Sequence, residues 1–210
     1  MKRAVIFGAS GLVGGALLDI LLSSGDYGEV VAIGRRPLDL HHPKLKQEII
    51  DMDQLDACSF QADHIFCTLG TTMKKAGSKE VFRKVDLAYP LAAARWGLAN
   101  GAQLFAVVTS LGSDINSLFF YSKVKGELET SLKKLNYASL GIFRPSMLLG
   151  NRQETRLAEN ISQKVMQGLN FLIPQNYKAI PAEKVAQAMY DLAKAEKPGI
   201  TEVNSGQMWS

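Results

Sequence analysis

A tyrosine and a lysine stand four residues apart in the segment FFYSKVKGELE, at Tyr121 and Lys125. On an α-helix this spacing places both side chains on one face, one turn apart. An ammonium group close to a phenol favours the phenolate and lowers the phenol's pKa from its usual value of about 10. Such a tyrosine can act as a general acid or base toward a carbonyl or alcohol oxygen, which a serine hydroxyl can also hydrogen-bond. Ser110 precedes this helix, so Ser110, Tyr121 and Lys125 form a predicted catalytic trio.

The spacing alone does not decide between catalysis and an ordinary amphipathic helix. Tyr190 and Lys194 show the same spacing in the segment YDLAK. The first pair follows a predicted strand that ends near Ser110, whereas no serine-bearing strand end precedes the second pair. We therefore predict catalysis at Tyr121, and at Tyr190 a half-buried aromatic ring beside a solvated lysine.

The segment GASGLVG places three glycines directly between a predicted strand and a predicted helix. Gly8 permits a tight turn, Gly11 lets the backbone approach a pyrophosphate, and Gly14 lets the helix pack closely. Because the first amides of the helix then face the anion, the predicted cofactor-binding residues also include Ser10, Leu12 and Val13. A glycine-rich turn without a ligand is the alternative, but the strand–turn–helix context favours binding.

The end of the second predicted strand selects the dinucleotide. An acidic residue about 20 positions past the glycines would bind the ribose hydroxyls of NAD. The sequence instead reads IGRRP, with Arg35 and Arg36. Guanidinium groups suit the 2′-phosphate of NADP, so we expect NADP(H) to be preferred over NAD(H). Two solvated surface arginines are the alternative.

Two further strand ends add expected cofactor contacts. In IIDMD, Asp51 can accept a hydrogen bond from the adenine amino group while Met52 packs on the ring. A helix cap by Asp51 or Asp53 is an equal alternative. The segment CTLGTT closes the fourth strand, at the edge where ligands of open α/β sheets bind. The residues expected on the nicotinamide side are therefore Leu69, Gly70 and Thr71.

These motifs lie on a regular alternation of strands and helices. Short apolar runs predict strands at 2–8, 29–35, 46–51, 64–70, 103–110 and 138–145, and a last strand near 201–204. Helical spacing follows the glycines and recurs at about 79–100, 120–135 and 181–195. The alternation predicts a doubly wound, Rossmann-like parallel α/β sheet with strand order 3-2-1-4-5-6 and a seventh strand.

We expect a single domain over residues 1–210, in which residues 146–180 form a small C-terminal cap with a helix at 157–167. The cap is expected to cover the nicotinamide as an apolar lid, through Met147, Leu148, Phe171 and Leu172.

Composition narrows the class of protein. Apolar residues make up 47% of the 210 residues and charged residues 21%, as in an ordinary globular chain. A net charge of +4 suits an anionic small molecule and falls short of a nucleic-acid-binding signature. Two cysteines and three histidines match no metal or disulfide pattern, so we expect no metal and a reducing, cytoplasmic setting. Asp19 interrupts the apolar N-terminal run, which we interpret as mature protein rather than a signal peptide.

Several segments together resemble the atypical branch of the short-chain dehydrogenase/reductase superfamily that includes the Tat-interacting protein and its bacterial oxidoreductase relatives. These segments are GASGLVG, CTLGTT, FRKVD, SLG, FYSKVKGELE, FRPSMLLG and NRQETR, within about residues 3–156. The resemblance implies a nicotinamide-binding fold, an NADPH preference, and the catalytic roles of Ser110, Tyr121 and Lys125. In the cofactor site we expect Tyr121 and Lys125 and, from FRPSMLLG, Arg144 and Pro145. The chain is short for members with a full substrate lobe, which argues against a bulky substrate.

We therefore predict an NADP-dependent oxidoreductase that transfers hydride between NADPH and a small carbonyl or alcohol substrate. The competing hypothesis is an NADPH-binding sensor that regulates a protein partner without significant turnover. The catalytic trio favours the enzyme, because a sensor has no need of it. We expect a small-molecule substrate, anionic or carbonyl, and neither nucleic acid nor membrane as a partner. A protein partner, a homodimer and the direction of the reaction remain open.

Overall fold

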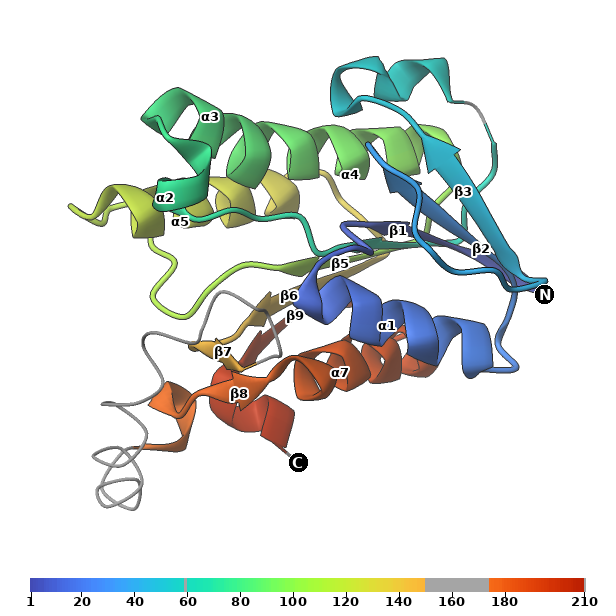
Figure 1. Ribbon diagram of the computed structural model, residues 1–210. Coiled ribbons are helices and arrows are strands. Elements are labelled where there is room, and N and C mark those ends of the chain that lie inside the picture. Colours follow the sequence, from blue (N-terminus) through green and yellow to red (C-terminus); the bar gives the residue numbers. More distant parts are fainter. Residues whose placement is uncertain (59, 150–173, 210) are drawn as a thin grey trace.

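The computed structural model describes residues 1–58, 60–149 and 174–209 and contains a large parallel sheet (Figure 1). Its strands are β1 (Lys2–Phe7), β2 (Tyr27–Gly34), β3 (Leu45–Ile49), β4 (His64–Cys67), β5 (Leu104–Val108), β6 (Ser139–Arg144) and β9 (Gly199–Asn204). Their order is β3-β2-β1-β4-β5-β6-β9, and neighbouring strands pair in parallel. The predicted doubly wound, Rossmann-like sheet and its seventh strand are confirmed.

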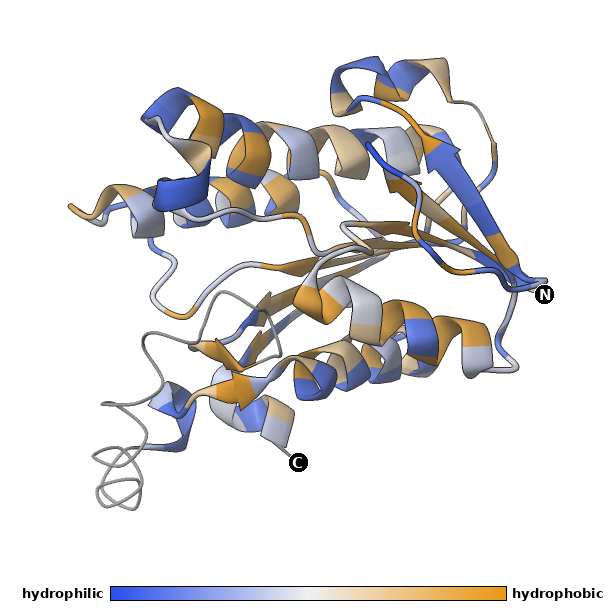
Figure 2. Cartoon of the chain, in the orientation of Figure 1, coloured by the Kyte–Doolittle hydropathy of each residue, from blue (hydrophilic) through white to orange (hydrophobic). Residues whose placement is uncertain are grey.

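Helices cover both faces of this sheet (Figure 1). On one face lie α1 (Leu12–Ser23) and α7 (Ala182–Ala195), whose apolar side chains share a core with β1 and β2. On the other face lie α4 (Tyr89–Ala99) and α5 (Phe120–Lys133), which pack with β4, β5 and β6 in a second core. The inner strands are thus buried on both faces, which explains why they read as continuous apolar runs (Figure 2).

The predicted helix at 79–100 is built from three consecutive pieces. A short α-helix, α3 (Lys79–Arg83), continues into a π-helical turn, η2 (Lys84–Ala88), and then into α4. π-helical turns are rare in proteins, and those that occur often lie at functional sites. Here it carries the buried carboxylate of Asp86.

Shorter elements flank the main sheet. They are the short α-helix α2 (Met73–Ala76), the 3-10 helices η1 (Met52–Ala57), η3 (Gln175–Tyr177) and η4 (Ser205–Trp209), and the two-residue strands β7 (Leu148–Leu149) and β8 (Ile180–Pro181). β7 and β8 form a separate two-stranded parallel sheet between the two ends of the segment predicted as a cap. The helix expected at 157–167 lies outside the described residues.

Candidate functional site

The glycine loop between β1 and α1 is packed so tightly that side chains would not fit at Gly8 and Gly14. Gly8 has a φ of +88°, and a Cβ added there would lie 2.7 Å from Thr68 Oγ1. A Cβ on Gly14 would lie 2.1 Å from the carbonyl oxygen of Gly8, because the first turn of α1 packs directly on the loop. The Gly11 amide donates a hydrogen bond to the same oxygen at 2.9 Å. This geometry has the features expected of a loop that cradles a pyrophosphate.

A cavity of about 360 Å³, which we call the arginine cavity, opens on one side of this loop. Arg35 and Arg36 line it and are exposed, and no ion pair links either arginine to another of the described residues. The other walls come from the glycine loop, β2, β3 and α4, and include Gly8, Ser10, Gln47, Met52, Leu69 and Tyr89. Apolar lining residues together with two exposed guanidinium groups suit the adenosine end of an anionic dinucleotide.

Asp51 and Met52 behave differently from each other. Met52 is buried and lines the arginine cavity. Asp51 is exposed and caps η1, because its carboxylate accepts a hydrogen bond from the Asp53 amide at 3.0 Å. This cap is the alternative that the sequence left open for Asp51.

A second cavity, of about 260 Å³, lies on the other side of the glycine loop, and we call it the tyrosine cavity. Leu69 lines both cavities, while Ser10 and Gly11, which are neighbours in the chain, line one each. The two cavities therefore flank the loop in the way that the two halves of a dinucleotide would require. The predicted residues that line the tyrosine cavity are Gly11, Leu12, Val13, Leu69, Gly70, Thr71, Tyr121 and Lys125.

Lys125 is held in the tyrosine cavity by a buried ion pair. Its ammonium nitrogen lies 2.8 Å from Asp86 Oδ1, and the two side chains are only 4% and 1% exposed. The other carboxylate oxygen of Asp86 accepts a hydrogen bond from the Thr71 amide at 2.9 Å. Asp86, on the π-helical turn, thus joins two other parts of the chain: the loop that follows β4, through Thr71, and helix α5, through Lys125. Sequence reasoning gave Asp86 no role, although a carboxylate within the largely apolar run VDLAYP was a signal for it.

Tyr121 stands one turn before Lys125 on α5 and is 39% exposed. Its ring packs on Phe82 of α3, with 5.5 Å between ring centroids, and its side chain lines the tyrosine cavity. The structure therefore brings Tyr121 and Lys125 to the same cavity, and their catalytic role stays a prediction.

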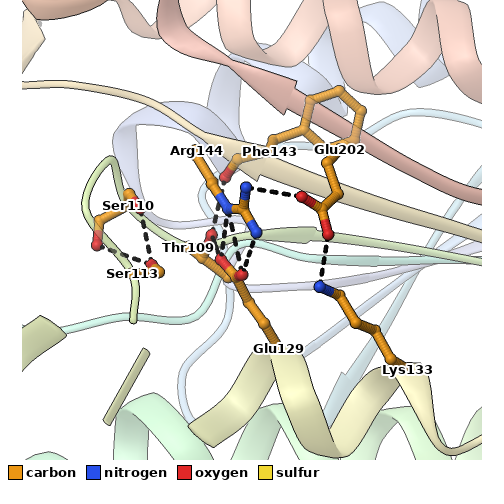
Figure 3. A network of polar contacts seen from close by, with 8 residues as sticks. All are labelled: Thr109, Ser110, Ser113, Glu129, Lys133, Phe143, Arg144 and Glu202. Carbon is orange, nitrogen blue, oxygen red and sulfur yellow. Dashed lines mark hydrogen bonds and ion pairs between the residues drawn. The ribbon is translucent and has the colours of Figure 1, made fainter. Parts of the chain in front are cut away.

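Ser110 follows β5 at the same edge of the sheet, but it does not line the tyrosine cavity among the described residues, whereas Thr109 does. Ser110 Oγ lies 3.3 Å from Ser113 Oγ, and Ser113 Oγ donates a hydrogen bond to the Ser110 carbonyl oxygen at 2.7 Å (Figure 3). In this arrangement the Ser110 hydroxyl takes part in the loop that follows the strand. The predicted trio is therefore only partly assembled around the cavity.

Glu129, one turn after Lys125, fastens α5 to the strand ends (Figure 3). Its carboxylate accepts a hydrogen bond from Thr109 Oγ1 at 2.7 Å and a forked pair from Arg144, with 3.0 Å to Nε and 2.5 Å to Nη2. Arg144 also pairs with Glu202 of β9, at 2.7 Å. These contacts fix the position of α5 against the ends of β5 and β6. Arg144, which the sequence placed in the cofactor site, is bonded to Glu129 and Glu202 instead. The hydrogen bonds to Glu129 raise the pKa of Arg144 above its ordinary value.

The remaining predicted residues lie near the same edge. The Pro145 carbonyl oxygen accepts a hydrogen bond from the Leu111 amide at 2.8 Å, which holds the loop after Ser110. Leu148 lines the tyrosine cavity, and Met147 is 59% exposed. Phe171 and Leu172 lie outside the described residues, as does the NRQETR segment.

The second tyrosine–lysine pair lies far from these cavities. Tyr190, on α7, donates a hydrogen bond to Asp26. Asp26 directly precedes β2 and therefore lies at the amino-terminal ends of the strands, whereas the cavities lie at their carboxyl ends. Among residues 1–58, 60–149 and 174–209, no three His, Cys, Asp or Glu side chains gather as a metal site. No helix in that part of the chain is both long and apolar enough to cross a membrane.

The fold of this chain is similar to that of solved short-chain dehydrogenases/reductases. A solved oxidoreductase of that family from Burkholderia thailandensis superposes with a TM-score of 0.71 at 20% identity, over 100% of this chain and 93% of its own. MoeE5, solved with UDP-glucose and NAD, superposes with a TM-score of 0.74 at 17% identity, over 96% of this chain and 76% of its own. Likeness at this level of identity concerns the fold.

Sequence comparison identifies the family. Protein HTATIP2 of Rattus norvegicus is 38% identical over 99% of this chain and 84% of its own length. Protein FMP52, mitochondrial, of Candida albicans is 30% identical over 90% of this chain and 86% of its own length. No protein-family profile matches the chain. The chain belongs to the family of HTATIP2 and FMP52.

Proposed function

We propose that this protein is an NADP-dependent oxidoreductase that transfers hydride between NADPH and a small carbonyl or alcohol substrate. The observation that carries the proposal is the meeting of Tyr121 and Lys125 in one cavity that adjoins the glycine loop. When bound, the nicotinamide supplies or accepts the hydride. Tyr121 exchanges the proton with the substrate oxygen, and Lys125 holds the adjoining part of the cofactor.

The preference for NADP rests on the arginine cavity. Arg35 and Arg36 are exposed at its rim, and the acidic residue that would bind the ribose hydroxyls of NAD is replaced by these arginines. A 2′-phosphate can take two forked guanidinium contacts there. The NAD bound by MoeE5 supports a nicotinamide dinucleotide in this type of fold.

The substrate in this proposal is small. The tyrosine cavity is only about 260 Å³, and its lining beyond the cofactor loop includes the polar residues Thr71, Thr72 and Thr109 and the apolar residues Val108 and Leu148. This mixture suits a short carbonyl compound with one or two further polar groups.

The proposal includes a reducing, cytoplasmic setting. Cys58 and Cys67 are free thiols, and burial raises the pKa of Cys67 to about 12, so that this thiol stays protonated. The FMP52 relatives are named as mitochondrial, and cell fractionation would distinguish the two locations.

A panel of small aldehydes, ketones and quinones tests the proposed activity. With NADPH present, at least one member should cause a fall in absorbance at the nicotinamide band that depends on protein concentration. NADPH binding without oxidation by any member of the panel would contradict the enzymatic proposal.

The second candidate function is an NADPH sensor that regulates a protein partner. The observation that favours it is the position of Ser110, whose hydroxyl lies against Ser113 instead of lining the tyrosine cavity. A sensor keeps the cofactor contacts and has no need of a serine aimed at a substrate. Binding of NADPH with no turnover, together with a partner whose binding depends on NADPH, would favour this function.

A further inference from the structure

The segment that carries the two arginines is fastened to the sheet by one side chain, that of Gln47 on β3. Gln47 Oε1 accepts a hydrogen bond from the Leu38 amide at 2.7 Å. Gln47 Nε2 donates to the carbonyl oxygens of Leu38, at 3.3 Å, and Leu40, at 3.2 Å. The side-chain amide therefore satisfies three backbone groups of the segment between β2 and β3.

This anchor lies immediately after the arginines. Only Pro37 separates Arg36 from Leu38, and a proline fixes its own φ near −65°. The backbone from Gly34, the last residue of β2, to Leu38 is thus held at both ends, although the arginine side chains themselves are exposed. Gln47 is paired in register with Ala32 of β2, so the anchor is attached to the rigid part of the sheet.

A fixed backbone matters because long arginine side chains lose conformational freedom when they bind an anion. Immobilising each such side chain costs conformational entropy, and a mobile backbone would add to that cost. A segment that is already held in place lowers the cost for a ligand that contacts the arginines. A ligand that does not contact them gains nothing from the anchor.

We infer that Gln47 is a positioning residue that sets the preference for NADPH over NADH, by holding the backbone from which Arg35 and Arg36 reach the 2′-phosphate. This inference rests on the proposed NADP-dependent function. It differs from a direct role in binding adenine, which is a real alternative because Gln47 also lines the arginine cavity. Contact with the adenine would affect both cofactors equally, since they share that base.

The test compares dissociation constants for NADPH and NADH, measured by calorimetric titration of the full chain. Gln47→Leu removes all three hydrogen bonds with a side chain of similar size. The ratio of the NADH to the NADPH dissociation constant should fall about tenfold, equivalent to about 1.4 kcal/mol. NADH binding itself should change by less than about twofold, because NADH has no 2′-phosphate for the positioned arginines to contact.

Gln103→Leu is the matched control. Gln103 is an exposed glutamine that directly precedes β5, so it lies at the amino-terminal ends of the strands, away from the arginine cavity. Its side chain donates a hydrogen bond to the Gly101 carbonyl oxygen. In Gln103→Leu, the ratio of the NADH to the NADPH dissociation constant should equal that of the wild type. If Gln47→Leu melts below the titration temperature, Gln47→Glu serves instead. That variant keeps an acceptor for the Leu38 amide and loses both donated bonds, and it should lower the ratio at least as much.

The outcomes separate the inference from the proposed function. A wild type that prefers NADPH, together with an unchanged ratio in Gln47→Leu, would overturn the role of Gln47 alone. Equal weakening of both cofactors would assign Gln47 to the adenine site and also overturn the inference. A wild type without a preference would overturn the NADP assignment, and the role of Gln47 with it.

Discussion

The ion pair between Lys125 and Asp86 makes a strong prediction about stability. Asp86→Asn keeps nearly the same shape and leaves an amide oxygen to accept the hydrogen bond from Thr71, now at 2.9 Å. It removes the negative charge that faces an ammonium group with a side chain only 4% exposed. Lys125→Met removes the positive charge and leaves the carboxylate. Each single substitution therefore leaves one buried charge without its partner.

The size of the effect follows from that burial. Breaking a buried ion pair by removing one partner destabilises a protein by about 3–5 kcal/mol. Because Thr71 still satisfies residue 86 in both variants, we expect the lower end, about 3 kcal/mol for each. The double variant buries neither charge, so its loss should be no larger than that of either single variant, at most about 3 kcal/mol. The coupling energy of the cycle is then at least about 3 kcal/mol.

Urea unfolding followed by circular dichroism measures this cycle, with the m-values compared to confirm that the same transition is observed. The control is Arg83 with Glu127, an ion pair of 2.7 Å between α3 and α5 whose side chains are 45% and 22% exposed. Arg83→Met and Glu127→Gln should couple by about 0.5 kcal/mol or less, because solvent screens that pair. Losses that simply add in the Asp86 and Lys125 cycle would refute a buried, coupled pair.

Three further predictions concern catalysis, the cofactor and pH. Tyr121→Phe should lower turnover on any substrate found by about 10²-fold or more with little change in NADPH affinity, whereas Tyr190→Phe should stay within about twofold; equal effects in a steady-state assay would contradict the assigned role. Arg35→Ala and Arg36→Ala should each weaken NADPH binding about tenfold in a fluorescence titration and leave NADH binding unchanged, so parallel losses would count against the 2′-phosphate site. Burial lowers the pKa of His64 from its usual 6.5 to about 4. The unfolded chain therefore binds the extra proton first, and stability is present above about pH 6.5 and falls by up to about 3 kcal/mol toward pH 4. His64→Gln should flatten that part of the stability curve measured by urea unfolding, and an unchanged slope would contradict the buried, neutral imidazole.

The parts of this protein that could be predicted from sequence are those set by local patterns. The strands of the main sheet are short apolar runs because both faces are covered, and the glycine loop is recognised by its place between a strand and a helix. The rule that parallel strands present their carboxyl ends at one edge then brings Leu69, Thr71 and Tyr121 together. Each of these steps needs only residues that are close in the chain.

The contacts that the sequence did not reveal depend on side chains that are distant in the chain or on exceptional backbone. Asp86 reaches Lys125 from a π-helical turn, and helical periodicity gives no sign of such a turn. Gln47 on β3 holds Leu38 in the loop that precedes this strand, and polar strand residues of this kind usually face solvent. The Ser110 hydroxyl points along its own loop because Ser113 is close enough to bond it, which depends on the turn after β5.

The measurement that tests the central claim most directly is a calorimetric titration of the wild-type protein with NADPH and with NADH under the same conditions. The cavities on the two sides of the glycine loop, with Arg35 and Arg36 at the rim of one, predict one NADPH per chain. They also predict that NADPH binds at least about tenfold tighter than NADH, a difference of about 1.4 kcal/mol. Equal affinities, a preference for NADH, or no binding of either cofactor would contradict the account.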